Sequence, residues 1–165
     1  MNLLKKIKKL FSISNDNSET TDTEELKDEI IEEFGPKNGL VETYEDFEED
    51  NEIVKMKISA NYKDGEIDGL FTMTDPEGNI RLKMNYVAGV KEGLQEEFHK
   101  NGNLRSRTEF KNDKENGIDE LYDDNGRLVV RSNFVNGLED GLCEYFDKEG
   151  KVLETVTFKN GEEIY

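Results

Sequence analysis

Apolar and polar residues alternate in short runs between residues 39 and 165, as expected of β-strands that bury one side. Turn signals interrupt these runs at regular intervals, and Asn-Gly between two such runs is a strong indicator of a β-hairpin. The first turn of each unit is Glu77-Gly78, Asn101-Gly102, Asn125-Gly126 or Glu149-Gly150, and the second is Ala88-Gly89, Asn112-Asp113, Asn136-Gly137 or Asn160-Gly161. The pattern predicts serial antiparallel hairpins.

The hairpin pattern has a period of 24 residues, set by Gly69, Gly93, Gly117 and Gly141. An aromatic residue precedes each of these glycines by seven positions: Tyr62, Tyr86, Phe110 and Phe134. A fixed period of this kind is typical of stacked repeats, in which each unit contacts only its neighbours. We expect a repeat domain at 39–165, with a degenerate first unit at 39–68 and units at 69–92, 93–116, 117–140 and 141–165.

Residues 1–38 lie outside the repeats and show a different pattern. Residues 1–11 predict a short basic amphipathic helix, and residues 12–21, rich in Ser, Asn, Asp and Thr, predict a linker. Apolar residues at helical spacing up to Phe34, followed by Gly35-Pro36, predict a second helix with an acidic back. The expected fold is mostly β: an elongated single sheet of about ten strands preceded by one or two helices.

Side-chain parity predicts three-residue loops at the first turns, with Gly102 in a left-handed bulge position and Phe98 opposite Leu104. The same register pairs Tyr122 with Leu128 and Phe146 with Val152. On the other face it pairs Glu97 with Arg105, Asp119 with Arg131, Leu121 with Val129, and Tyr145 with Leu153. Opposite charges then meet, and apolar side chains meet apolar ones.

This register predicts one apolar face and one mixed face. The apolar face would collect Leu70, Ile80, Leu82, Met84, Tyr86, Leu94, Phe98, Leu104, Phe110, Ile118, Tyr122, Leu128, Val130, Phe134, Leu142, Phe146, Val152, Val156 and Phe158. Its burial would be the main source of stability. The mixed face would be polar in the middle and would end in an apolar patch of Leu121, Val129, Tyr145 and Leu153.

The formal net charge of −17 narrows the choice of partner. Such a surface repels phosphate backbones and attracts basic proteins, so nucleic acid is not an expected ligand. The exception is the N-terminal segment, where Lys5, Lys6, Lys8 and Lys9 could give a weak contact with an anionic membrane through residues 1–11.

The single cysteine, Cys143, excludes an intramolecular disulfide and suits a reducing compartment. No apolar run reaches the length of a membrane span, and lysines interrupt the apolar residues at the N-terminus. The expected location is the cytoplasm.

No constellation in the sequence indicates catalysis, a metal site or a cofactor. His99 stands just before a turn without a second histidine or a cysteine cluster, and we expect an exposed loop residue. Glu96, Glu120 and Glu144 recur in phase and predict partly solvated strand glutamates rather than catalytic carboxylates. The acidic runs lack the glycine-punctuated spacing of a calcium loop. The chain is therefore not expected to be an enzyme.

The unit Gly-Leu-x-Glu-x-Phe/Tyr-Asp-x-x-Gly-x-Leu, followed by Phe-x-Asn-Gly, resembles the MORN-variant repeat of YwqK-type antitoxin proteins. The resemblance covers residues 69–165 closely and 39–68 loosely. It implies serial β-hairpins in an elongated sheet and a toxin-neutralising role.

The sequence thus predicts a non-catalytic protein-binding module whose partner is a protein, such as a toxin with a basic surface. The candidate partner-binding residues are Leu121, Val129, Tyr145, Leu153, Arg105, Arg107 and Arg131. The apolar patch among them could instead lie under the helix ending at Phe34. A membrane-peripheral or structural scaffold is the alternative function.

Overall fold

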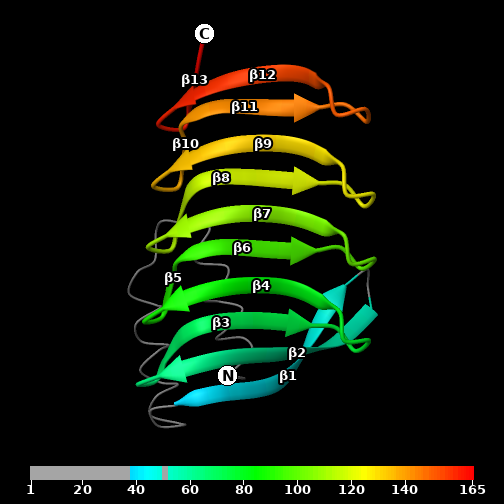
Figure 1. The fold of residues 1–165 in the computed structure, drawn as a ribbon, viewed down its shortest axis with the longest axis vertical. Helices are drawn as coiled ribbons and strands as arrows, with labels where there is room; N and C mark the ends of the chain where they lie inside the picture. Colours follow the sequence, from blue (N-terminus) through cyan, green and yellow to red (C-terminus); the bar gives the residue numbers. More distant parts are fainter. Residues whose placement is uncertain (1–37, 50–51) are drawn as a thin grey trace.

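The computed structural model describes residues 38–49 and 52–165, which form one antiparallel sheet of thirteen strands (Figure 1). The strands are β1 (Gly39–Glu49), β2 (Glu52–Lys63), β3 (Glu66–Thr74), β4 (Ile80–Val87), β5 (Val90–Lys91), β6 (Gly93–Phe98), β7 (Leu104–Lys111), β8 (Lys114–Tyr122), β9 (Leu128–Val135), β10 (Leu138–Glu139), β11 (Gly141–Phe146), β12 (Val152–Lys159) and β13 (Glu162–Ile164). The predicted single sheet of serial hairpins is confirmed, with more strands than the ten expected. The predicted helices lie outside the described residues, and the domain division at residue 39 stays a prediction.

Strands follow one another across the sheet in chain order, β1-β2-β3-β4-β6-β7-β8-β9-β11-β12-β13. The short strands β5 and β10 extend the pairing of β4 and β9 at the second turns. Each unit therefore pairs its strands with those of the preceding and the following unit, as in stacked repeats.

The first turn of each unit has the predicted three-residue loop. At the turn between β6 and β7, the His99 amide donates to the Asn103 carbonyl at 2.9 Å and the Gly102 amide donates to the His99 carbonyl at 2.9 Å. Gly102 has a φ of 85°, the left-handed conformation that closes the loop. Phe98 lies opposite Leu104, Tyr122 opposite Leu128, and Phe146 opposite Val152, as predicted.

One step further into the hairpin, the register shifts in each of the four units from residue 69 onward, whereas β1 and β2 pair without a shift. Phe98 pairs with Leu104, but Glu97 pairs with Ser106, so Arg105 has no partner of its own. The same shift leaves Arg81, Val129 and Leu153 as extra residues in the other three units. This arrangement is a β-bulge, in which two residues of one strand oppose one residue of the next.

Because of this bulge, the pairing predicted for the mixed face is wrong. Asp119 pairs with Ser132, Leu121 with Val130, and Tyr145 with Glu154, each one position beyond the predicted partner. Arg105 still reaches Glu97, with Nη1 3.8 Å from Oε2, although it is not its register partner.

The prediction of a single apolar face is also wrong, because the bulge moves part of each strand's side chains to the other face. Residues directly opposite each other share a face, so Leu94 lies with Glu109 while Phe110 lies with Gly93 on the other side. We call the face that carries Phe71, Met84, Thr108, Ser132 and Cys143 the inner face, and its reverse the outer face. Apolar side chains predicted to share one surface are divided between these two.

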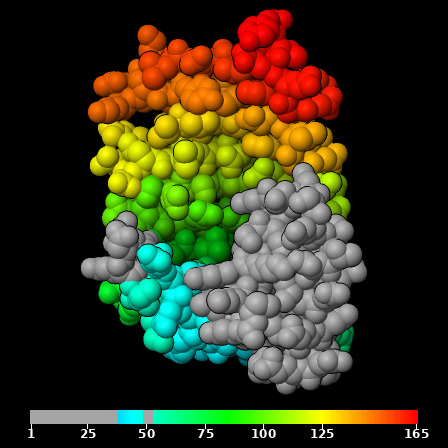
Figure 2. All heavy atoms as spheres, turned by 180° about the vertical axis from the view of Figure 1, so that it is seen from behind, coloured from blue at the N-terminus to red at the C-terminus, as the bar shows by residue number. Residues whose placement is uncertain are grey.

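The hydrophobic core lies on the inner face of the first units. Its buried members are Ile58, Ala60, Phe71, Met84 and Tyr86, and the Phe71 and Tyr86 rings meet edge to face with centroids 6.1 Å apart. Phe47 of β1 packs against this cluster. Figure 2 shows the long β1–β2 hairpin, in cyan, lying over the inner face.

Glycines and aromatic residues face each other in every unit. The inner-face pairs are Gly39 with Tyr62, Gly69 with Tyr86, Gly93 with Phe110, Gly117 with Phe134, and Gly141 with Phe158. Gly117 has a φ of 133°, a conformation that strains other residues, and a side chain at this position would collide with Glu109. This pairing explains why the glycine and the aromatic residue keep the same phase.

Second turns link each unit to the one before. The Gly137 amide donates to the Glu115 carbonyl at 2.8 Å, and the Gly161 amide donates to the Glu139 carbonyl at 2.8 Å. The residue before this amide is left-handed in every unit: Ala88, Asn112, Asn136 and Asn160 have φ angles of 49°, 52°, 55° and 53°. Asparagine tolerates this conformation better than alanine.

We therefore expect Ala88→Asn to stabilise the protein by about 0.5–1 kcal/mol, because it relieves a left-handed alanine. The matched change Asn136→Ala should destabilise it by a similar amount. Urea unfolding of the two variants and the parent protein measures both effects. Destabilisation by Ala88→Asn would contradict the equivalence of the two turns.

Candidate protein-binding surfaces

The outer face carries a ladder of alternating charge that runs across the strands. Lys83, Glu96, Arg107, Glu120, Arg131 and Glu144 are consecutive register partners on β4, β6, β7, β8, β9 and β11. Each charge inside this charge ladder therefore has opposite charges on both neighbouring strands, an arrangement that favours cross-strand attraction.

Contacts along the charge ladder are short where the carboxylates are partly buried. Lys83 Nζ lies 3.1 Å from Glu96 Oε2, and Arg131 Nε lies 3.0 Å from Glu120 Oε1. Arg131 Nη1 also lies 3.7 Å from Glu144 Oε2. The Glu120 side chain, 13% exposed, accepts a second hydrogen bond from the Tyr122 hydroxyl at 2.8 Å. The recurring glutamates thus have a structural role in joining the units.

The inner face changes character along the repeats. Beyond the apolar core, β6, β7 and β8 present polar side chains: Gln95, Glu97, Ser106, Thr108 and Asp119. The face becomes apolar again in a column formed by Leu121, Val130 and Tyr145, which pair successively on β8, β9 and β11. We call these three residues the C-terminal column.

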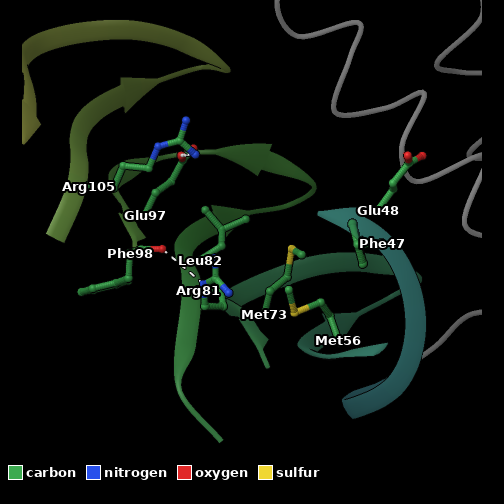
Figure 3. A pocket seen from close by; sticks show the side chains of 9 residues that line it. All are labelled: Phe47, Glu48, Met56, Met73, Arg81, Leu82, Glu97, Phe98 and Arg105. Atoms are coloured by element: carbon green, nitrogen blue, oxygen red, sulfur yellow. Dashed lines mark hydrogen bonds and ion pairs between the residues drawn. The ribbon is translucent and has the colours of Figure 1, made fainter. Parts of the chain in front are cut away.

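A first cavity of about 260 Å³ lies where the β1–β2 hairpin approaches the main sheet (Figure 3). Its apolar wall consists of Phe47, Met56, Met73 and Leu82. The polar side holds Arg81, Glu97 and Arg105, and Arg81 Nε donates to the Phe98 carbonyl at 3.3 Å. An apolar pocket with a few charged groups at its edge is typical of binding sites.

A second cavity of about 320 Å³ adjoins the first, because both are lined by Leu82 and Glu97. The other lining residues are Met84, Lys91, Gln95, Ser106, Thr108, Phe110, Glu115 and Asp119. Thr108 Oγ1 donates a hydrogen bond to Asp119 Oδ1. Figure 2 shows the inner face recessed between the cyan hairpin and the yellow strands. The two cavities form one groove along the middle of this face.

Burial perturbs the charged groups of the second cavity. The pKa of Lys91 is lowered by burial, an effect that Asp113 and Glu115 oppose, and its Nζ lies 4.8 Å from the centre of the Phe110 ring. The pKa of Glu115 is raised, first by burial and then by the negative charge of Asp119, although Lys91 acts in the opposite direction. The cavity is thus a desolvated, acidic environment.

The structure does not bring the seven predicted partner-binding residues together. Leu121 and Tyr145 belong to the C-terminal column, where they are 41% and 38% exposed. Val129, Leu153 and Arg105 are the extra residues of bulges, so Val130 takes the place expected for Val129. Arg107 and Arg131 lie on the opposite, outer face in the charge ladder. Whether these residues bind a partner stays a prediction.

His99 is not the exposed loop residue that the sequence predicts, since its side chain is only 18% exposed. Its Nε2 lies 3.0 Å from the Tyr122 carbonyl oxygen, and its Nδ1 lies 2.9 Å from Asp124 Oδ1. The equivalent position in the other units is occupied by Asp75, Asp123 or Asp147, whose carboxylate accepts hydrogen bonds from backbone amides of its own turn. His99 instead connects its turn to the next one.

Within residues 38–49 and 52–165, no group of three or more His, Cys, Asp or Glu side chains is arranged to hold a metal ion. The same part of the chain contains no helix long and apolar enough to cross a membrane.

Fold and surfaces define an open β-sheet repeat protein with a grooved face. Comparison with protein families agrees with this class: residues 91–112 and 139–160 match the family described as MORN repeat variant. The match supports a MORN-variant repeat protein, and it suggests a repeat module of a kind often used for protein or membrane binding and generally non-enzymatic. No curated protein matches the chain.

The raised pKa of Glu115 predicts a pH-dependent effect on stability. A carboxyl group whose pKa is raised by folding contributes most below its ordinary value of 4.5, and this contribution is lost as the pH rises through the folded-state value. We expect Glu115→Gln to be more stable than the parent at pH 7, and the difference to vanish below the ordinary pKa. Urea unfolding across this pH range measures the difference.

Glu77→Gln, at an exposed turn, is the matched control and should show no such pH dependence. If the free energy of unfolding of Glu115→Gln differs from that of the parent by the same amount at every pH, this result would contradict the desolvation of Glu115.

Proposed function

We propose that this protein is a non-catalytic protein-binding module of the cytoplasm that neutralises a toxin by covering the toxin's functional surface. The observation that carries this proposal is the C-terminal column, an apolar strip that stays exposed on the inner face beyond the polar middle of the sheet. Leu121 and Tyr145 are 41% and 38% exposed, and Val130 lies between them. Protein interfaces commonly combine such an apolar centre with a polar rim.

Polar groups border the C-terminal column at one end and on the next strand. Asp119 and Ser132 lie two residues away on β8 and β9, and Glu154 is the register partner of Tyr145 on β12. Acidic side chains beside an apolar strip suit a partner with basic residues around an apolar centre. The net charge of −17 would also accelerate association with a basic toxin.

Two further features support a protein rather than a membrane as the partner. The strongly negative net charge opposes adsorption to the anionic surface of a bilayer. The match to the MORN repeat variant is compatible with protein binding, and the resemblance of the repeat unit to YwqK-type antitoxins supports the specific role. A membrane-peripheral or structural scaffold is the competing outcome of the experiment below.

The experiment compares two leucines of equal exposure on opposite faces. Leu121 on the inner face and Leu142 on the outer face are 41% and 42% exposed. We expect co-expression of the chain to rescue growth of cells producing the toxin encoded beside it. Leu121→Asn should weaken binding to that toxin at least tenfold, because it introduces a polar group at the interface centre. Leu142→Asn should leave affinity within twofold.

Equal losses for the two variants would contradict binding through the inner face. Absence of growth rescue, together with vesicle binding that depends on residues 1–11, would replace the toxin-neutralising function by a membrane-peripheral one.

A further inference from the structure

The second cavity contains an acceptor that the fold leaves unpaired. Gln95 Nε2 donates to Glu97 Oε1 at 3.0 Å, which fixes the orientation of the amide. Gln95 Oε1 is buried and has no hydrogen-bond partner in the described part of the chain. Buried acceptors are rarely left unpaired in folded proteins. Because Gln95 lines the second cavity, a donor that enters this cavity would complete the amide.

The net negative charge of the cavity wall also favours a cationic ligand. Three carboxyl groups, those of Glu97, Glu115 and Asp119, line it together with the ammonium of Lys91, which gives the wall a net charge of −2. Arg105, which lines the first cavity, approaches Glu97 from the other side at 3.8 Å. The carboxyl groups come from β6 and β8, on either side of β7. A positively charged guest would offset their mutual repulsion in a site with restricted access to water.

Apolar groups in the same wall favour a guanidinium over an ammonium group as the cation. The Phe110 ring, Leu82 and Met84 offer surface to an aliphatic stem and to the flat side of a charged group. A guanidinium is planar, stacks on aromatic rings and presents five donors in a fixed fork, whereas an ammonium is a compact and strongly hydrated charge. The volume of about 320 Å³ lies at the lower end of ligand pockets, which suits one side chain.

We propose that the second cavity receives an arginine side chain of the protein partner, an assignment that rests on the proposed function. The guanidinium donates to Gln95 Oε1 and to the carboxylate of Glu97, while its stem lies along Phe110 and Leu82. The C-terminal column then contacts the apolar centre of the partner surface, and the arginine fixes its position along the inner face.

The test uses the full chain, labelled with ¹⁵N, and N-acetyl-arginine amide as the probe at low ionic strength. We expect saturable shifts at Gln95, Glu97, Thr108 and Asp119, including the side-chain amide of Gln95. The citrulline analogue, which has the same shape without the charge, should cause no saturable shift. Binding should weaken at least fivefold in Gln95→Met, which keeps the length of the side chain and removes the acceptor.

Glu77→Gln is the matched control, because it removes one negative charge from an exposed turn, and its affinity should stay within twofold of the parent. Asp119→Asn gives a second variant inside the cavity, and an unchanged amide spectrum elsewhere shows that each variant is folded. Equal shifts at acidic residues all over the surface, or equal losses in Gln95→Met and Glu77→Gln, would overturn the assignment.

Removal of residues 2–11 provides a further check on the occupant. A fivefold gain in probe affinity would identify the chain's own lysines as competitors and would overturn the assignment to a partner; an unchanged affinity supports it.

A toxin that binds the parent and Gln95→Met equally, without any binding of the probe, overturns the cavity site and leaves toxin neutralisation intact. Probe binding at the cavity without growth rescue overturns toxin neutralisation and retains a guanidinium site.

Discussion

One extra residue in the second strand of each unit from residue 69 onward determines the surface chemistry of this protein. Strand side chains alternate strictly between faces, so a single inserted residue moves every later side chain of that strand to the other side. Arg105 is this residue in the unit that begins at Gly93. Because of it, Phe110 joins the inner face opposite Gly93, and Arg107 joins Glu96 on the outer face. The bulge recurs in each of the four units from residue 69 onward, so the same division of faces extends through these units.

The two faces that result serve different purposes. The outer face holds the units together through the charge ladder, in which partly exposed ion pairs each contribute little but specify the register between strands. The inner face holds the hydrophobic core near the N-terminal units, a polar groove in the middle and the C-terminal column beyond it. The groove borders the core directly, because Met84 of the core and Leu82 beside it also line the second cavity.

The sequence was sufficient for the architecture because the information that specifies it is local. The Asn101-Gly102 turn, the glycine period and the alternation of apolar residues together predict serial hairpins and the correct partner of Phe98. The sequence does not predict the bulge, because the extra residue differs in type between units, being arginine at Arg105 and valine at Val129. No residue type marks a bulge that lies beyond the turn, and charge pairing even favoured the wrong partner for Glu97.

The site was less predictable than the fold. Leu121 and Tyr145 were identified as neighbours, because both precede a first turn at the same phase of the repeat. The groove could not be predicted, since it depends on the β1–β2 hairpin lying over the sheet and on residues, such as Gln95 and Glu115, that meet only after the register is known. The available signal for the charge ladder is an arginine eleven residues after two of the recurring glutamates, Arg107 after Glu96 and Arg131 after Glu120.

Nuclear Overhauser contacts between side chains of β8, β9 and β11 test the bulge most directly. The structure predicts contacts between the Leu121 and Val130 methyl groups, and between Val130 and the Tyr145 ring. Contacts of Leu121 with Val129 and of Tyr145 with Leu153, without any involvement of Val130, would restore the continuous alternation and contradict the division of the two faces.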